Sequence, residues 1–225
     1  MPENPAEANR CCSPMLHAEN LALSLPLHPP LRVPRLIVRT SGFVAILAEK
    51  RTTPPTLQRA LLETLAGDRP AETGRVLFLD QDLGQASPGW ATEHGLSLLL
   101  SKGGCDPTSS VEANLLGSTG SSLPAWLFRF LPLEAHLSVQ AGRLSSIEQR
   151  WLALACALAP RPRLLLLERP FEALPPLPRE ALLERILRIN LEEGIAFCFT
   201  AEPSPVIQTA AASTYRIADN LLVSA

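Results

Sequence analysis

Three short runs of consecutive apolar residues predict strands that are buried on both faces. They cover residues 43–47, 164–167 and 196–199, and each is joined to a helical pattern by a short loop. Parallel strands that are covered by helices on both sides have this uninterrupted apolar character. Shorter or more mixed patterns predict further strands at residues 18–25, 36–38, 75–79, 96–100 and 215–223.

Between the strands, apolar residues recur at helical spacing. Leu57, Leu61 and Leu65 follow one another every four residues, and Gly67 comes next as a stop. Thr53 is expected to cap this helix, with Pro54 in its first turn. Further helices are predicted at residues 111–116, 124–131, 146–158 and 178–193. Because buried strands alternate with helices, the sequence predicts an α/β fold with a largely parallel sheet.

The pattern also divides the chain. Residues 1–15 are polar and contain proline, so a flexible N-terminal tail is predicted there. Residues 16–225 are expected to form a single domain. Within it, residues 101–145 are rich in Ser, Gly and Pro around short helical segments, which predicts a small helical insert.

Composition narrows the class of protein. The chain has 225 residues, 46% hydrophobic and 19% charged, which is ordinary for a globular domain. With a net charge of −2, the chain has no excess of basic residues that would indicate binding to nucleic acid or to an anionic membrane. No apolar run approaches the ~18 residues of a membrane span. Because no apolar segment of the secretory type opens the chain, a soluble protein of a reducing compartment is expected.

Cysteine and histidine suggest no metal site. Five scattered cysteines do not predict a disulfide framework, and Cys156 and Cys198 are interpreted as small buried hydrophobic residues. Cys11 and Cys12 could bind a metal or sense redox state, but no further ligand lies at zinc-site spacing. The histidines are isolated from acids and nucleophiles: His17, His28, His94 and His136.

Several segments together resemble one known family. The strand 43–47, the loop after it and the helix ending at Gly67 have the frame of a phosphate-binding loop. In order and spacing, this frame and the segments that follow resemble the nucleotide-binding subunits of ABC transporters from about residue 16 onward. The resemblance implies a P-loop NTPase-like three-layer domain with a short helical subdomain. The other matching segments are 73–78, 110–115, 144–150, 159–171 and 217–219.

The phosphate loop departs from the family pattern, which is Gly-x-x-Gly-x-Gly-Lys-Ser/Thr-Thr. The family needs the glycines so that backbone N–H groups wrap phosphate, and the Lys to reach the β- and γ-oxygens. Pro54 stands where the Lys belongs, and Pro54 and Pro55 remove two N–H donors. A rescued anion site built on Lys50 and Arg51 stays open as an alternative. The degenerate loop consists of Ala48, Lys50, Arg51, Thr52, Thr53, Pro54, Pro55 and Thr56, with Glu49 between its first two members.

The second family motif is also altered. The Leu-Ser-Gly-Gly-Gln signature, which touches the γ-phosphate on the opposite subunit, corresponds here to Leu144, Ser145, Ser146, Ile147 and Glu148. The same residues have a simpler interpretation, because Ser-x-x-Glu is a capping box that begins a helix.

The catalytic positions of the family are replaced as well. By the resemblance, Glu168 takes the place of the Mg²⁺-supporting Asp and Arg169 that of the catalytic carboxylate. Ser101 aligns with the polarising Gln and Ala201 with the switch His. Arginine stays protonated and cannot act as a general base. We therefore expect no catalytic residues, no metal and no cofactor, with ATP and Mg²⁺ bound only if the phosphate loop works unexpectedly.

A partner surface is a further candidate. Trp126, Phe128 and Phe130 lie in the insert, and in the family this region receives the coupling helix of the transporter. Packing into the local core is the competing interpretation. The insert is also short, about 30 residues from Asn114 to Leu144, so the docking surface of the family could be incomplete here.

Three hypotheses about function follow. The first is a degenerate ABC-type protein, a non-hydrolysing pseudo-ATPase that serves as a subunit or regulator of a membrane transport complex. It would be cytoplasmic or peripheral on the inner face of the membrane, with a permease, a permease-associated subunit or an intact ABC ATPase as partner. The second is a stand-alone interaction or scaffold protein, and the third is a working ATPase with unorthodox residues.

Overall fold

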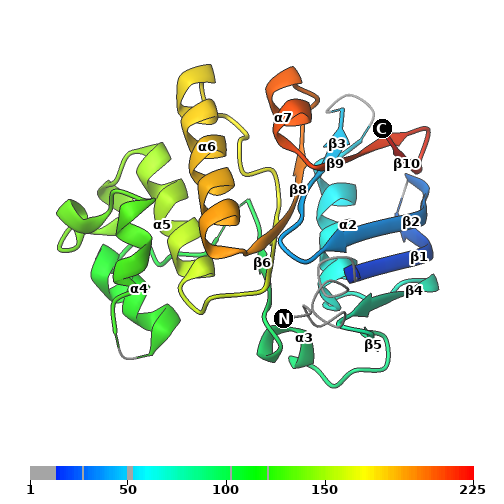
Figure 1. Cartoon of the computed structure of the whole chain (residues 1–225), viewed down its shortest axis with the longest axis horizontal. Coiled ribbons are helices and arrows are strands. Elements are labelled where there is room, and N and C mark those ends of the chain that lie inside the picture. Colours follow the sequence, from blue (N-terminus) through cyan, green and yellow to red (C-terminus); the bar gives the residue numbers. More distant parts are fainter. Residues whose placement is uncertain (1–13, 27, 50–52, 102, 121) are drawn as a thin grey trace, which may run out of the picture.

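A computed structural model describes residues 14–26, 28–49, 53–101, 103–120 and 122–225, which form one sheet of ten strands with helices around it (Figure 1). The strands are β1 (Pro14–Leu25), β2 (His28–Arg39), β3 (Phe43–Ala48), β4 (Thr73–Phe78), β5 (Gln81–Asp82), β6 (Leu96–Leu99), β7 (Leu164–Leu167), β8 (Ala196–Ala201), β9 (Ser213–Ala218) and β10 (Leu221–Ser224). The α-helices are α2 (Pro55–Ala66), α3 (Trp90–Glu93), α4 (Val111–Thr119), α5 (Ser146–Leu158), α6 (Pro176–Glu193) and α7 (Pro205–Ala210).

The parallel part of the sheet carries the buried strands. Its order is β9-β3-β8-β7-β6, and every neighbouring pair in it is parallel. All residues of β3, β7 and β8 are buried, because helices cover both faces. The three strands predicted from continuous apolar runs are therefore confirmed, and with them the α/β fold.

An antiparallel arm, β5-β4-β1-β2, extends the sheet, which is therefore mixed rather than largely parallel. β2 runs over His28–Arg39, although only residues 36–38 were predicted as strand because prolines interrupt the pattern. The prolines are tolerated because β10 pairs with β2 at one register position, Leu221 opposite Arg32. Further along β2, the Ile37 N–H donates to the Tyr215 hydroxyl at 3.0 Å, so a side chain takes the place of a ladder partner.

Two predicted boundaries need correction. β1 begins at Pro14 and Met15 is buried, so the predicted tail 1–15 is two residues too long; residues 1–13 lie outside the described part. The strand predicted at 215–223 is a hairpin of β9 and β10, because Asp219 and Asn220 have positive φ and turn the chain back. The helix α7 was not predicted.

The sheet separates two hydrophobic clusters. Alternate residues of β3 point to opposite sides, as strand geometry requires. Val44 and Ile46 pack with α2 and the antiparallel arm, whereas Phe43 and Leu47 pack with the helices α4–α7. Figure 1 shows this arrangement, with α4, α5 and α6 gathered at one end and α2 against β1–β3 at the other. The result is a three-layer core.

The predicted insert is made of α4 and three 3₁₀ helices, η1 (Ala125–Arg129), η2 (Glu134–His136) and η3 (Ala141–Arg143). Its buried residues, among them Leu115, Leu127 and Leu133, belong to the same cluster as Leu165 and Phe199 of the sheet. The insert therefore packs on the sheet domain through a continuous core. Its assignment as a subdomain of residues 101–145 stays a prediction.

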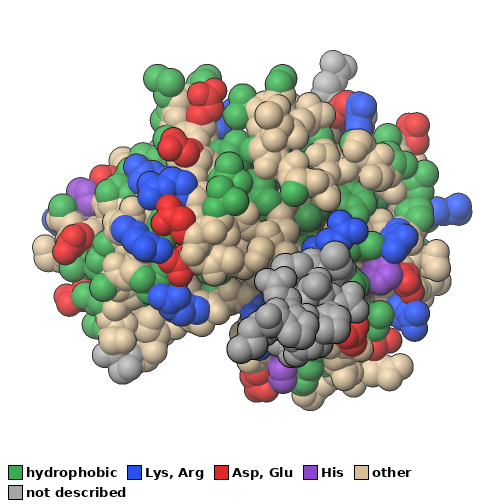
Figure 2. Space-filling view, viewed as in Figure 1, with side chains coloured by type: hydrophobic (Ala, Val, Ile, Leu, Met, Phe, Trp, Pro, Cys, Tyr) green, Lys and Arg blue, Asp and Glu red, His purple; other side chains and the backbone are tan. Residues whose placement is uncertain are grey.

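Charged side chains on the visible surface lie in mixed groups. Figure 2 shows acidic and basic side chains interspersed over the lobe of α4–α6. Ion pairs account for part of this mixing: Arg161 lies 3.1 Å from Glu193, and Arg188 lies 3.1 Å from Glu192. Exposed pairs of this kind each contribute only about 0–1 kcal/mol, but they leave this surface without a large excess of one charge.

Gly74 is a position where the fold depends on glycine. Its φ is +81°, and a Cβ there would lie 2.3 Å from the Glu19 carbonyl oxygen in the neighbouring strand β1. We expect Gly74→Ala to lower the free energy of unfolding by more than about 2 kcal/mol, since strain and a backbone clash add together. Gly89→Ala is the matched control, because Gly89 has φ +83° with no heavy atom within 4 Å of the added Cβ. Urea unfolding measures the stability of both variants. Equal losses of stability would contradict the predicted clash between a Cβ at residue 74 and the backbone of β1.

Candidate functional site

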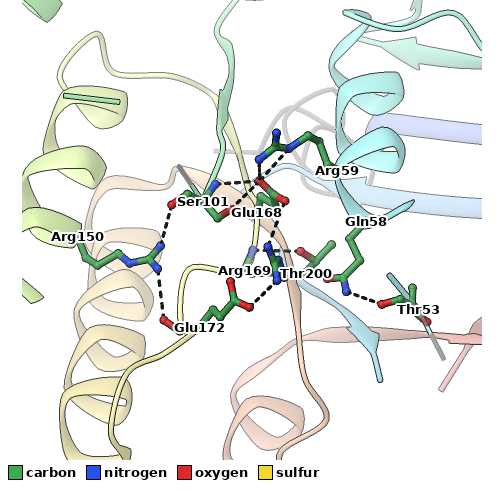
Figure 3. A network of polar contacts seen from close by, with 9 residues as sticks. All are labelled: Thr53, Gln58, Arg59, Ser101, Arg150, Glu168, Arg169, Glu172 and Thr200. Atoms are coloured by element: carbon green, nitrogen blue, oxygen red, sulfur yellow. Dashed lines mark hydrogen bonds and ion pairs between the residues drawn. The ribbon is translucent and has the colours of Figure 1, made fainter. Parts of the chain in front are cut away.

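A polar network lies at the carboxyl ends of the parallel strands, the edge where ligands bind in open α/β sheets. Ser101 comes just after β6, Glu168 and Arg169 follow β7, and Thr200 lies near the end of β8. Figure 3 shows these side chains converging, with Arg59 of α2 on the other side of Glu168. The structure therefore brings together Glu168, Arg169 and Ser101, three of the residues that the sequence placed at family site positions.

Glu168 is the centre of this network and is only 2% exposed. Its Oε2 accepts hydrogen bonds from Arg59 Nε at 3.3 Å and Nη2 at 3.0 Å. The same oxygen accepts from the Ser101 backbone N–H at 2.9 Å and the Ser101 hydroxyl at 3.0 Å. One buried carboxylate oxygen thus joins α2 to the segment after β6.

The network keeps Glu168 ionised. Burial acts to raise the pKa of this carboxyl, but the Ser101 N–H and the Arg59 guanidinium stabilise the charged form more strongly, and the pKa is lowered. Arg59 was not among the predicted site residues. Its only signal in the sequence was a basic residue one turn into the helix after the phosphate loop.

Arg169 is fixed by the residues around it. Its φ is +44°, its N–H donates to Thr200 Oγ1 at 3.1 Å, and its Nη1 donates to Glu172 Oε1 at 2.5 Å. Arg150 of α5 adds a second guanidinium, donating to the Ser101 carbonyl at 3.5 Å and the Glu172 carbonyl at 3.3 Å. Cations therefore border the buried carboxylate on more than one side.

Two positions in the described part of the predicted phosphate loop lack an N–H donor. Lys50, Arg51 and Thr52 lie outside the described residues. Pro54 is the N-cap of α2 and Pro55 its first residue, so neither offers an N–H. The Leu57 N–H is already bonded to the Pro54 carbonyl at 3.0 Å. The predicted Thr53 cap is wrong, because Pro54 takes the cap position and Thr53 instead accepts from the Gln58 amide at 3.3 Å through its carbonyl.

The altered signature forms a helix start, which confirms the capping-box interpretation. The Ser145 hydroxyl accepts from the Glu148 N–H at 3.4 Å, and the Ser145 N–H donates to Glu148 Oε2 at 2.8 Å. The hydrogen bond from the Ser145 hydroxyl lowers the pKa of Glu148. Leu144 is buried and Ile147 packs against the core, so these residues have local structural partners.

The aromatic residues of the insert are not equally accessible. Phe130 is fully buried, so its prediction as a partner-binding residue is wrong. Its ring instead packs in the hydrophobic core. Trp126 and Phe128 are half-buried. The Trp126 ring meets Phe130 edge-on at 6.3 Å, and Arg161 lies over it at 4.4 Å. Two of the three predicted residues therefore keep exposed surface.

Two negative findings concern the described residues only. They contain no helix that is long and apolar enough to cross a membrane. They also contain no cluster of three or more His, Cys, Asp or Glu side chains that could hold a metal ion.

Solved structures with the same fold are ATP-binding cassettes. The cassette MJ1267 of an ABC transporter, in its ADP conformation, gives a TM-score of 0.78 at 16% identity over 94% of this chain and 90% of its own. CbiO1 from Clostridium perfringens, part of an ABC transporter complex, gives 0.78 at 15% identity over 93% and 87%. The fold is therefore that of an ATP-binding cassette, a P-loop NTPase-like α/β domain.

Curated relatives carry related names. PhnC 2 of Rhodopseudomonas palustris (strain BisA53), a phosphonates import ATP-binding protein, is 27% identical over 70% of this chain and 64% of its own length. ThiQ of Ruegeria sp. (strain TM1040), a thiamine import ATP-binding protein, is 31% identical over 60% and 61%. The chain spans less than two thirds of the length of these relatives, and no model of a known protein family matches it. Relatives and structural neighbours point to the ATP-binding (nucleotide-binding) domain family of ABC transporters.

The Arg59–Glu168 pair gives a stability prediction. Arg59→Met keeps the apolar stem but removes the guanidinium nearest to the buried carboxylate, so we expect the free energy of unfolding at pH 7 to fall by about 2 kcal/mol. Arg75→Met is the control: it removes an ion pair with Glu19 in which both side chains are partly exposed, and should cost less than about 1 kcal/mol. Urea unfolding of both variants makes the comparison, and similar losses would show that the buried pair is not special.

The same pair gives a pH dependence. Because the folded-state pKa of Glu168 is lowered, its contribution to stability is complete above the unfolded-state pKa and is lost as the pH falls through the folded-state value. The stability difference between the wild type and Arg59→Met should therefore be largest at pH 7 and shrink below about pH 4.3. Unfolding curves from pH 7 to pH 3 measure it. A difference that stays constant over this range would mean that the variant acts through packing alone.

Proposed function

We propose that this chain is an ABC ATPase-type protein that does not hydrolyse ATP, and that it serves as a subunit or regulator of a membrane transport complex. The observation that carries the proposal is the Glu168 oxygen, which already holds the Arg59 guanidinium at 3.0 Å and both donors of Ser101. By the resemblance to the family, Glu168 would take the place of the Mg²⁺-supporting carboxylate.

The residues present do not fit a magnesium–nucleotide complex. Mg²⁺ demands oxygen ligands in near-ideal octahedral geometry at 2.0–2.1 Å. A divalent cation at Glu168 Oε2 would have to displace Arg59 or lie against a guanidinium of the same charge. In the phosphate loop, Pro54 and Pro55 remove two N–H groups that could otherwise help to bind the phosphates.

The chemistry of the neighbouring positions also argues against hydrolysis. Arg169 stays protonated and is held by Glu172, so it cannot accept a proton from water. Ala201 offers only a methyl group where the family has a histidine.

Calorimetric titration of the full chain with Mg-ATP tests the proposal. We expect a dissociation constant in the millimolar range or weaker and no phosphate release, because most charge-assisted hydrogen bonds to phosphate are missing and each is worth about 1.5–3 kcal/mol. Turnover above background would refute it. A micromolar constant that Arg51→Ala abolishes would instead support the rescued anion site.

The names of the relatives support a role beside a permease, since PhnC 2 and ThiQ are import ATP-binding proteins. For this chain we propose such a partner, at the inner face of the membrane, contacted through Trp126 and Phe128 of the insert. These two rings keep exposed surface next to Arg129 and Arg161, and aromatic residues with arginine are the common anchors of interfaces. A stand-alone scaffold role is the alternative.

Trp126→Ala separates binding from folding. We expect it to weaken the complex by more than about 1 kcal/mol while the chain stays folded. Phe130→Ala is the contrasting variant, because it empties a fully buried site and should cost about 3–5 kcal/mol of stability. Affinity for the permease co-purified from host membranes and thermal unfolding are the two measurements. If Trp126→Ala unfolds the chain without a separate effect on binding, the ring belongs to the core and the contact is elsewhere.

A further inference from the structure

Two cysteines that are distant in the sequence lie next to each other beside the polar network. Cys105 is in the loop after β6, and Cys156 is in α5. The backbone of Gly104 reaches this helix, because a Cβ at Gly104 would lie 3.4 Å from Ala153 Cβ. Ala153 is one turn before Cys156. The loop therefore brings Cys105 to the part of α5 that carries the second thiol.

Hydrogen bonds hold the loop in this position. The Asp106 N–H donates to Asn114 Oδ1 at 2.7 Å, and the Asn114 amide donates to the Asp106 carbonyl at 3.0 Å. The Asp106 carboxylate accepts from the N–H of Thr108 at 2.9 Å and the hydroxyl of Ser109 at 2.6 Å. Asn114 belongs to α4, which packs on α5. Cys105 thus sits directly before an anchored residue.

The two thiols are free, and they interact through a hydrogen bond. Cys105 is half-buried and Cys156 buried, and both belong to the same hydrophobic cluster. The hydrogen bond between them raises the pKa of Cys105 and lowers the pKa of Cys156. Cys105 lines a cavity of about 400 Å³ together with Gly103 and Ala153, which gives a small oxidant a route to the pair.

We propose that Cys105 and Cys156 form a reversible disulfide when the protein meets a hydroperoxide. One thiolate attacks a peroxide oxygen and becomes a sulfenic acid as the first water leaves; the second thiol attacks the sulfenic sulfur and displaces another water. In sum, two thiols and one hydrogen peroxide give one disulfide and two waters. The two electrons lost by the sulfurs reduce the O–O bond.

The disulfide would act on the site through the loop it fastens. Ser101, which supplies two of the four donors to Glu168, lies at the start of the same loop. Tying Cys105 to α5 would restrict the loop that begins at Ser101 and therefore stiffen the Glu168 network. This inference concerns the thiols alone and stands whether or not the chain binds nucleotide.

Peptide mapping of the full reduced chain after treatment with hydrogen peroxide tests the proposal. Trypsin cuts after Lys and Arg, so Cys105, Cys156, Cys198 and the pair Cys11–Cys12 fall on four different peptides. We expect the peptides of Cys105 and Cys156 to become cross-linked at least tenfold more often than any other pair, and a dithiol reductant to separate them. Hydrogen exchange at residues 103–110 should slow in the oxidised form.

Two variants sharpen the result. Cys105→Ser should abolish the cross-link, whereas Cys198→Ser should leave it unchanged, because Cys198 is fully buried in β8 and burial raises its pKa to about 12. A cross-link from Cys105 to Cys11 or Cys12, over-oxidation of Cys105 to a sulfinic acid without cross-linking, or no loss of thiols would each overturn the proposal.

Discussion

A buried negative charge has to be paired, and in this protein that requirement organises the carboxyl edge of the sheet. Glu168 is 2% exposed, and Arg59 and Ser101 supply the donors that keep it ionised there. The pairing connects three elements: α2 through Arg59, the end of β6 through Ser101, and the end of β7 through Glu168 itself. Removing one partner would leave the other uncompensated, so the interaction both fixes the edge and limits what else it can bind.

The hydrophobic frame and the polar edge depend on different residues. The two clusters on either side of the sheet are built from β3, β7 and β8 with their covering helices, whereas Glu168, Arg169 and Ser101 form the polar network beyond the strands. A chain can therefore keep the cassette fold while the polar residues at the ends of its strands change. Fold and activity are separable properties, and a fold match alone does not carry a function.

The sequence was informative where one local interaction decides the structure. Continuous apolar runs are enough to bury β3, β7 and β8, and Ser145 with Glu148 makes a cap from neighbouring residues. It was uninformative where the partner comes from far along the chain. Arg59 contacts Glu168 only in the folded chain, because the two residues are far apart in the sequence. Phe130 was predicted to be exposed, but it is buried at the end of η1. β2 forms a strand despite its prolines because β1 pairs with it.

The strands at the two ends of the sheet order are short: β5 has two residues and β6 has four. A short edge presents few unpaired N–H and C=O groups, so another chain finds little on which to add a strand. These two edge strands therefore contribute little to edge-to-edge aggregation.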